Sequence, residues 1–397
     1  MQPRKTQVEV AEEALSKLRQ YGLAYLAMEE RTGKTLAALL TAELSNANRI
    51  LVITKKNPKE SISETLAAWE HTKYFRLTTY HSVTKIPIST PFDMVILDEA
   101  HNYISAFPKP GKIWKDLRPY CAGKPILYLS ATPHAQSLAQ LYHQFALCSW
   151  SPWIRYPTFY AWHNVYGKPY TIELNNRDVN QYDRTDKAKV MADVQHLFIT
   201  KTRAEIGFKH EPEDCLHFIE PSEPLKQVYN TILKDSVIKL SVGKLVCDSK
   251  SKLRTSLHQL EGGTIIVDDK RHVLANTEKV DYILEKWGDV PSLVIMYNFQ
   301  AEKVKLEKYF KQATILQATS FAEGIDLYQY DTLVIYSQDY STARHTQRRA
   351  RQANMARDKP ITVHFLLMKK GISAQVYKSV SINKRNYVDS VFNKEFL

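Results

Sequence analysis

Short apolar runs alternate with helix-compatible stretches near the N-terminus, and this alternation limits the fold more than any other feature of the sequence. The four apolar runs are residues 23–28, 49–54, 94–97 and 125–129. The stretches between them, such as 35–44 and 61–69, have helical patterning. Because strands separated by helices of this length are typical of crossover connections, we predict an α/β fold built on a parallel sheet.

The last hundred residues repeat this alternation. Their apolar runs are residues 292–297, 332–336 and 361–367, and residues 301–311 have helical patterning. One hydrophobic core rarely organises a chain of 397 residues, so the length favours two domains, or two with an insertion. We therefore predict a second lobe with a parallel sheet flanked by helices.

The middle of the chain has a different composition. An aromatic cluster at 150–166 is followed by helical, charge-balanced sequence with an expected β-hairpin at 262–273. Aromatic rings can stack on nucleic-acid bases, but we favour core packing for this cluster because Trp and Tyr bury well. The predicted domains are a first lobe over 1–150, a mainly helical inter-lobe segment over 151–274 and a second lobe over 275–397.

Composition excludes several classes of protein. With 44% hydrophobic residues, 24% charged residues, 12 Gly and 4 Cys, the chain is not expected to be disordered, collagen-like or held by disulfides. The cysteines form no Cys-x-x-Cys pair and the histidines show no metal-ligand spacing, so we expect no zinc knuckle and a reducing cytoplasm. Charges near the N-terminus argue against a signal peptide, and polar residues within the uncharged stretch 125–154 argue against a membrane span.

The excess positive charge is confined to the two ends of the chain. The formal net charge of +12 divides into +5 for residues 1–150, with 18 Lys+Arg against 13 Asp+Glu, 0 for 151–290, with 20 against 20, and +7 for 291–397, with 16 against 9. This distribution suits a polyanion held by two lobes, because each neutralised phosphate releases counterions. A generally basic protein with no nucleic-acid partner is the alternative.

A phosphate-binding loop is predicted between the first apolar run and the helical pattern that follows it. The sequence there is EERTGKT, in which the loop backbone would cradle phosphates, Lys34 would reach the β- and γ-phosphates and the Thr35 hydroxyl would bind Mg²⁺. Met28 stands where such loops carry their first glycine, which leaves an ordinary helix N-terminus as the alternative. The predicted ATP-binding residues of the loop are Glu30, Arg31, Thr32, Gly33, Lys34 and Thr35.

Two adjacent carboxylates follow the third apolar run, in the sequence VILDEAH. Asp98 would hold Mg²⁺, and Glu99 would orient and deprotonate the water that attacks the γ-phosphate. The alternative is the start of a loop with solvated acids. A further buried run ends in Ser-Ala-Thr-Pro at 130–133. The hydroxyls there can contact the Asp-Glu-Ala-His segment and change their contacts with the state of the nucleotide. We assign this coupling to His101, Ser130 and Thr132.

These elements, in this order, resemble helicases and translocases of superfamily two, and more narrowly the Snf-type branch, which has small bacterial and bacteriophage members. The resemblance implies two RecA-like lobes with ATP and Mg²⁺ as cofactors. By the same resemblance Gln7 would recognise adenine, and the LTTY sequence ending at residue 80 would touch the nucleic-acid backbone. Lys55 lies at the position where proteins of this branch contact the nucleic-acid strand along which they move. A solvated loop is the alternative. The nucleic-acid residues implied in the first lobe are Lys55, Thr78, Thr79 and Tyr80.

The resemblance continues through the rest of the chain. FITKTRAEI at 198–206 resembles the basic segment that enters the second lobe, residues 276–279 resemble the element before its first helix, and 292–298 resembles motif IV. ATSFAEGIDL at 318–327 resembles motif V. There, the resemblance implies nucleic-acid contacts for Thr319 and Ser320 and nucleotide contacts for Gly324 and Asp326.

Motif VI is the least regular match. QRRARQ at 347–352 resembles it, which implies a coupling role for Gln347 and an arginine that reaches the γ-phosphate. Spacing from Gln347 would place the second arginine at 354, which is Asn here, whereas a shifted alignment uses Arg348 and Arg351. Arg351 is favoured because it fits both alignments.

Together, the sequence predicts an ATPase that moves along DNA, with double-stranded DNA preferred and single-stranded DNA or RNA as other partners. A strand-unwinding DNA helicase or an RNA-remodelling ATPase is the first alternative. A nucleotide-binding scaffold without hydrolysis is the second. We expect a monomer in the cytoplasm of a bacterial or phage-infected cell, with no membrane partner.

Overall fold

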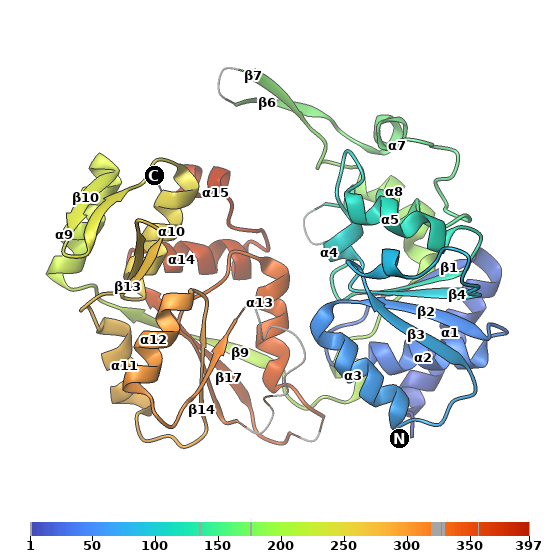
Figure 1. Cartoon of the computed structure of the whole chain (residues 1–397), viewed down its shortest axis with the longest axis horizontal. Coiled ribbons are helices and arrows are strands. Elements are labelled where there is room, and N and C mark those ends of the chain that lie inside the picture. Colours follow the sequence, from blue (N-terminus) through green and yellow to red (C-terminus); the bar gives the residue numbers. More distant parts are fainter. Residues whose placement is uncertain are drawn as a thin grey trace. The chain divides into compact units, whose positions relative to one another are not determined.

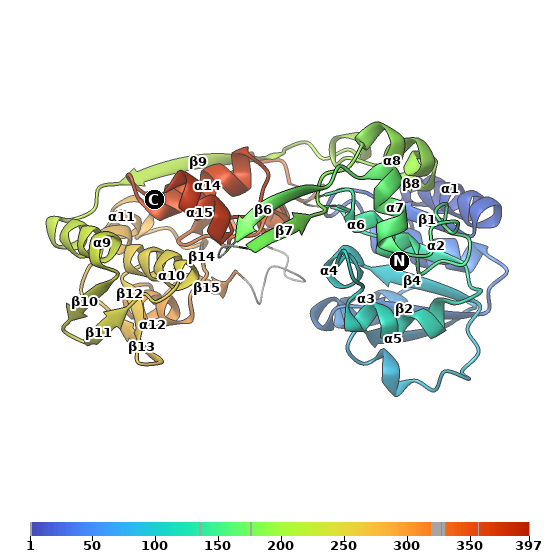
Figure 2. The same ribbon diagram turned by 90° about the horizontal axis from the view of Figure 1, so that it is seen from above.

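The structure is a computed structural model that divides the chain into two compact units, Met1–Gly207 and Phe208–Leu397 (Figure 1). It describes residues 2–396 apart from 135–136, 175–176, 319–326, 328–329 and 356, and leaves undescribed the side chains of 174, 177, 343, 347, 351, 390 and 394. Figure 2 shows the same units from above. Each unit is an α/β structure, so the predicted fold class is confirmed.

The first unit contains a six-stranded parallel sheet in the order β3-β2-β4-β5-β1-β8. Its central strands are short runs of fully buried apolar residues, as parallel strands covered on both faces require. The strands are β1 (Leu23–Leu26), β2 (Arg49–Thr54), β3 (Tyr74–Thr79), β4 (Met94–Asp98), β5 (Ile126–Leu129) and β8 (Phe198–Ile199).

Helices cover both faces of this sheet and create two hydrophobic cores. Successive residues of β1 show the division: Leu26 packs with Val10 and Leu39 on one face, while Tyr25 packs with Trp153 on the other. The helices are α1 (Lys5–Tyr21), α2 (Lys34–Leu44), α3 (Lys56–Ala67), α4 (His101–Ile104), α5 (Lys112–Cys121), α6 (Gln140–Phe145), α7 (Phe159–Tyr166) and α8 (Lys187–Val194). A hairpin of β6 (Tyr170–Leu174) and β7 (Arg177–Gln181) lies outside these layers (Figures 1 and 2).

The aromatic cluster belongs mainly to the second of these cores. Trp153, Phe159, Trp162 and Tyr166 are buried against the sheet, which confirms core packing for these rings. Trp150 is exposed.

The second unit contains a five-stranded parallel sheet in the order β15-β14-β16-β17-β9. Its strands are β9 (Pro212–Ile219), β14 (Leu293–Tyr297), β15 (Thr314–Gln317), β16 (Thr332–Ile335) and β17 (Ile361–Met368). Its helices are α9 (Glu223–Asp235), α10 (Lys250–Glu261), α11 (Glu278–Trp287), α12 (Gln300–Tyr309), α13 (Thr342–Arg349), α14 (Ile372–Tyr377) and α15 (Asp389–Glu395). Two hairpins complete it, β10 (Val237–Leu240) with β11 (Gly243–Val246), and β12 (Thr264–Val267) with β13 (Lys270–Val273), the latter as predicted.

The division of the chain differs from the expected one. The segment 151–274, expected between the lobes, is shared by the two units. Its strand β8 pairs with β1 in the first sheet, whereas β9 pairs along its whole length with β17 in the second. Each sheet therefore takes an edge strand from this segment, and the boundary falls at Gly207. Within the described residues, no helix is long and apolar enough to span a membrane.

Candidate nucleotide-binding site

The predicted residues of the first unit meet at one edge of its sheet. The phosphate loop follows β1, Asp98 ends β4, and Ser130 follows β5. Because β4, β5 and β1 are adjacent and parallel, their carboxyl ends lie together. In open α/β sheets this edge is where ligands bind.

The phosphate loop is held in shape by bonds within itself. Lys34 Nζ donates to the carbonyl oxygens of Met28, at 2.8 Å, and Glu29, at 2.9 Å, and Thr32 Oγ1 donates to the Glu29 oxygen at 2.7 Å. Gly33, with a φ of 88°, is the N-cap of α2. Met28 is only 1% exposed and packs into the core around α1 and α2. Met28, which stands in place of the usual glycine, is therefore part of the hydrophobic core.

Gln7 lies directly over this loop, together with Arg4. The Gln7 amide donates to the Gly33 carbonyl at 3.3 Å and accepts from the Arg4 backbone at 2.9 Å, while Arg4 Nη2 donates to the Thr32 carbonyl at 3.1 Å. A Cβ at Gly33 would come within 2.3 Å of the Gln7 side chain. The backbone angle of Gly33 favours glycine, and a larger residue there would also displace the end of the Gln7 side chain. Arg4 was not predicted, since a single basic residue near a terminus gives no signal.

Asp98 is fixed from two sides. Thr54 Oγ1, at the end of β2, donates to Asp98 Oδ2 at 2.6 Å, and Tyr80 Oη donates to the Asp98 carbonyl at 2.7 Å. The carboxylate is buried. Thr54 thus holds this carboxylate, and it was not predicted as a site residue because a threonine at the end of an apolar run is indistinguishable from the rest of the strand.

Glu99 has a backbone conformation that is unusual for its residue type. Its φ is 51°, in the left-handed region, and its N–H donates to the Leu129 carbonyl of β5 at 2.8 Å. Strained backbone of this kind is concentrated at functional sites. Burial, and next the neighbouring Asp98, raise the pKa of Glu99 well above its usual range, while Lys34 and Lys55 oppose this shift.

His101 joins the acidic segment to the loop after β5. Its Nδ1 lies 2.7 Å from Ser130 Oγ and 3.5 Å from Glu99 Oε2, and its Nε2 lies 3.4 Å from Thr132 Oγ1. Ser130 is fully buried and also accepts the Thr132 N–H at 2.9 Å. Burial, followed by Lys55 and Lys34, lowers the pKa of His101 to about 3, so the ring is neutral at pH 7. The predicted contact between these segments is present.

The structure corrects the expected role of Tyr80. Its ring is 1% exposed and stacks on Tyr103, with centroids 4.2 Å apart, so it cannot touch a nucleic-acid backbone. The sequence LTTY placed it at a loop, whereas its hydroxyl is bound to the Asp98 carbonyl inside the core. Thr78 is also buried, and Thr79, at the end of β3, is half-buried.

We expect Tyr80→Phe to lower the free energy of unfolding by about 1 kcal/mol, because one buried hydrogen bond is lost while the ring is retained. Binding to DNA should be unchanged. Chemical denaturation and a DNA-binding titration measure the two effects. A loss of DNA affinity at unchanged stability would instead indicate that Tyr80 contacts DNA directly.

An arginine that was expected elsewhere also lies at the phosphate loop. The segment 198–206 was expected to enter the second lobe, but β8 pairs with β1 and brings Arg203 to the loop. The Arg203 N–H donates to Glu29 Oε2 at 2.8 Å, and its guanidinium lies 3.9 Å from Glu29 and 3.8 Å from Glu30. Glu30, predicted as an ATP residue, is thus part of an ion-pair group at the loop.

The arginines of α13 have separate surroundings within the second unit. Arg349 binds Asp214 of β9 at 2.5 Å and the Pro212 carbonyl at 2.6 Å, so its role is structural. Arg348 is 3% exposed and lies 3.7 Å from Asp339. The side chains of Gln347 and Arg351 lie outside the described residues, as do Thr319, Ser320, Gly324 and Asp326.

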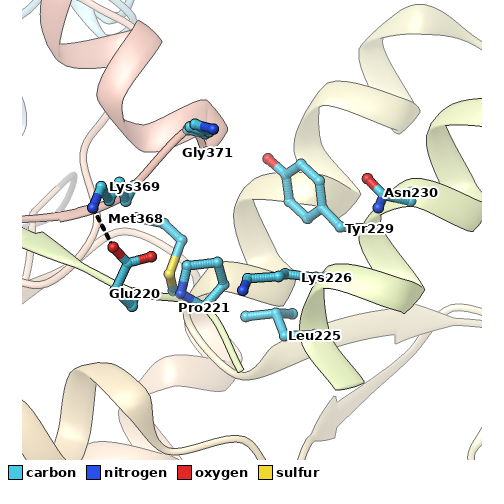
Figure 3. A pocket seen from close by; sticks show the side chains of 10 residues that line it. Glu220, Pro221, Leu225, Lys226, Tyr229, Asn230, Met368, Lys369 and Gly371 are labelled. Carbon is cyan, nitrogen blue, oxygen red and sulfur yellow. Dashed lines mark hydrogen bonds and ion pairs between the residues drawn. The ribbon is translucent and has the colours of Figure 1, made fainter. Parts of the chain in front are cut away.

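The second unit also has a pocket of about 420 Å³ beside α9 and the turn between β17 and α14 (Figure 3). Tyr229 and Lys226 line it from α9, and an ion pair between Lys369 and Glu220 lies at its side (Figure 3). Among the described residues that line it, none was predicted as a site residue. We therefore do not assign the nucleotide to this pocket.

Comparisons with known proteins found matches among solved structures. No family model and no curated protein matches the chain. A solved structure of the Sulfolobus solfataricus SWI2/SNF2 ATPase core in complex with dsDNA is similar, with 14% identity, 96% of this chain and 91% of that chain covered, and a TM-score of 0.45. The same organism's SWI2/SNF2 ATPase core domain covers 99% of this chain and 92% of its own, at 14% identity and a TM-score of 0.43. Functional roles therefore rest on the geometry of this chain.

Proposed function

We propose that this chain is an ATPase that moves along DNA by coupling ATP hydrolysis to the closing and opening of its two units. The observation that carries the proposal is the edge of the first sheet, where Lys34 lies beyond β1 and Asp98 and Glu99 lie at the end of β4, with β5 between these two parallel strands. A lysine at a helix N-terminus and a pair of adjacent carboxylates are groups that phosphoryl transfer from ATP uses.

The residues at this edge fit a nucleotide with Mg²⁺. Lys34 would exchange the carbonyls of its own loop for phosphate oxygens, and Thr35 and Asp98 offer the oxygen ligands that Mg²⁺ prefers. Bound Mg²⁺ would neutralise charge on the phosphates. Thr54 fixes one Asp98 oxygen and thereby orients the other.

Glu99 would take the proton of the attacking water. Desolvation, and next the charge of Asp98, raise its pKa, so the ionised Glu99 carboxylate is a stronger base than one in water. Neutral His101 would transmit a change at Glu99 to Ser130 and Thr132, because it lies next to all three. Gln7 would contact adenine from its place over the loop.

For the second unit we propose that Arg351 supplies the positive charge that stabilises the transition state. Arg348 is the weaker choice, since its side chain is buried and lies near Asp339. Arg349 already has partners in Asp214 and Pro212. Gly324 and Asp326 would contact the nucleotide, and Lys55, Thr79, Thr319 and Ser320 the nucleic acid.

The positive charge of each unit supports a polyanion, such as DNA, as the partner. The first unit has 26 Lys+Arg against 19 Asp+Glu, and the second has 28 against 23, so each has a positive excess. We expect DNA affinity to fall steeply as salt rises, because bound lysines and arginines release counterions, and to depend little on sequence. Fluorescence anisotropy with random duplexes at several salt concentrations measures both. Affinity that is insensitive to salt would contradict this prediction.

Displacement of a third strand from duplex DNA tests movement itself. A translocase should release a triplex-forming oligonucleotide only with ATP and without separating the duplex. Release of one strand from a forked duplex would instead indicate an unwinding helicase. Activity on structured RNA alone would indicate an RNA-remodelling ATPase. ATP binding with no displacement and no hydrolysis would indicate a scaffold.

A further inference from the structure

Two histidines and a cysteine meet on one face of the second sheet, far from one another in sequence. Cys215 and His217 are alternate residues of the edge strand β9, and His364 of β17 pairs with Cys215 in the parallel register. Alternate residues of a strand share a face, so all three side chains lie on the same side of the sheet. Their ligand atoms all lie within 4.8 Å of one another.

We propose that Cys215, His217 and His364 form a binding site for Zn²⁺ that ties the edge strand β9 to β17. Thiolate sulfur and imidazole nitrogen are the donors that Zn²⁺ prefers. A tetrahedral zinc ion with bonds of 2.0 to 2.3 Å needs ligand atoms about 3.3 to 3.6 Å apart. His217 Nε2 and His364 Nδ1 are 3.0 Å apart and the Cys215 sulfur lies within 4.8 Å of each, so rotations of the side chains would bring the three atoms to these distances.

The imidazole rings of both histidines are in contact with neighbouring side chains. His217 Nδ1 lies 2.8 Å from the Tyr282 hydroxyl, which leaves Nε2 as the nitrogen that faces His364. Ligating histidines use their second nitrogen in this way to fix the ring. The Trp287 ring, at centroid distances of 5.3 Å and 4.7 Å, covers both imidazoles. Both are thus held beside a large apolar ring.

A tetrahedral zinc ion takes four ligands. Within the described residues the cluster has three members, so a water would complete the coordination.

The proposed zinc site joins the first strand of the second unit to the rest of its sheet. The first strand of the second unit is β9, and it begins five residues after Gly207, where the first unit ends. β9 is an edge strand and therefore has only one neighbour, β17. The chain thus enters the second sheet through this single strand pairing. A metal ligated by both strands would stabilise that pairing.

Cobalt substitution tests the site, because Co²⁺ takes the place of Zn²⁺ and gives a thiolate-to-metal charge-transfer band. The full chain, free of affinity tags and stripped of metal by a chelator, is titrated with Co²⁺ without nucleotide and then with Zn²⁺. We expect one charge-transfer site per chain, displaced by one equivalent of Zn²⁺. Cys215→Ser should lose the band, and His364→Gln should weaken Zn²⁺ binding by about tenfold or more.

Matched controls separate this site from other thiols and imidazoles. Cys247→Ser and His272→Gln change the same residue types elsewhere in the second unit and should bind as the parent does. Circular dichroism establishes that each variant is folded. The parent protein is sufficient for the main test. If it shows no thiolate-to-cobalt band, the proposal is overturned. Unchanged Zn²⁺ affinity in both Cys215→Ser and His364→Gln would overturn it as well.

Discussion

Glu99→Gln is expected to reduce ATP turnover by about 10² to 10⁴-fold while ATP binding is retained, because general-base catalysis typically contributes that much. The amide can still hydrogen-bond the attacking water but cannot take its proton. The substitution is close to isosteric, so the glutamine side chain should occupy the place of Glu99 between Leu129 and His101. Steady-state hydrolysis and the affinity for a fluorescent ATP analogue measure the two effects.

Lys34→Ala is the contrasting variant for this experiment. Lys34 would act on the phosphates themselves, so its loss should weaken nucleotide binding as well as turnover. If Glu99→Gln retains more than about a tenth of the parent turnover, the general-base role fails. If both variants lose binding equally, the division of roles between loop and carboxylate is wrong.

The second large effect is expected for Arg351→Ala, which should lower DNA-stimulated turnover by about 10³ to 10⁵-fold at saturating ATP. An arginine that meets charge developing on the transferred phosphate acts in the transition state, so ATP affinity should change little. Arg351→Lys should restore only part of the rate, because a single ammonium cannot reproduce the planar guanidinium fork. Single-turnover hydrolysis with saturating DNA measures the effect.

Two neighbours on α13 provide controls for Arg351. Arg344→Ala removes a more exposed arginine that pairs with Asp339 and should leave turnover near that of the parent. Arg348→Ala should lower turnover less than Arg351→Ala, and any loss should accompany a loss of stability, since its guanidinium is buried. Near-normal rates for both Arg351→Ala and Arg348→Ala would exclude this segment as the source of the arginine.

The sequence predicted the strands that lie inside the sheets, because their signal is local. Arg49–Thr54 was predicted at its observed bounds, and 361–367 differs from β17 by one residue. Fully buried parallel strands are continuous apolar runs, and such runs stand out in a sequence. The acidic segment after β4 could be placed for the same reason, since its carboxylates follow such a run.

Edge strands were missed because they lack this signal. β9 contains Glu213, Asp214 and His217 among its apolar residues, and β8 is only two residues long. An edge strand is partly solvated and has one neighbour, so polar residues are tolerated there. The expected domain boundaries failed at this point, because each sheet takes its edge strand from the segment between the apolar blocks.

Contacts between distant residues were also beyond the sequence pattern. The hydrogen bond from Thr54 to Asp98 and the position of Arg203 at the phosphate loop depend on which strands are neighbours. Likewise, His217 and His364 are 147 residues apart, so no ligand spacing could indicate a cluster. The opposite error occurred at Tyr80, where a local motif suggested a surface role for a ring that the fold buries.

The most direct test of the proposed function is the rate of ATP hydrolysis measured with no nucleic acid, with single-stranded DNA, with double-stranded DNA and with RNA. A DNA translocase with its phosphate site at Lys34, Asp98 and Glu99 should hydrolyse ATP slowly alone and be stimulated most by double-stranded DNA. The Glu99→Gln variant should remain inactive in all four conditions. Equal rates in all four conditions for the parent, or stimulation by RNA alone, would contradict the account.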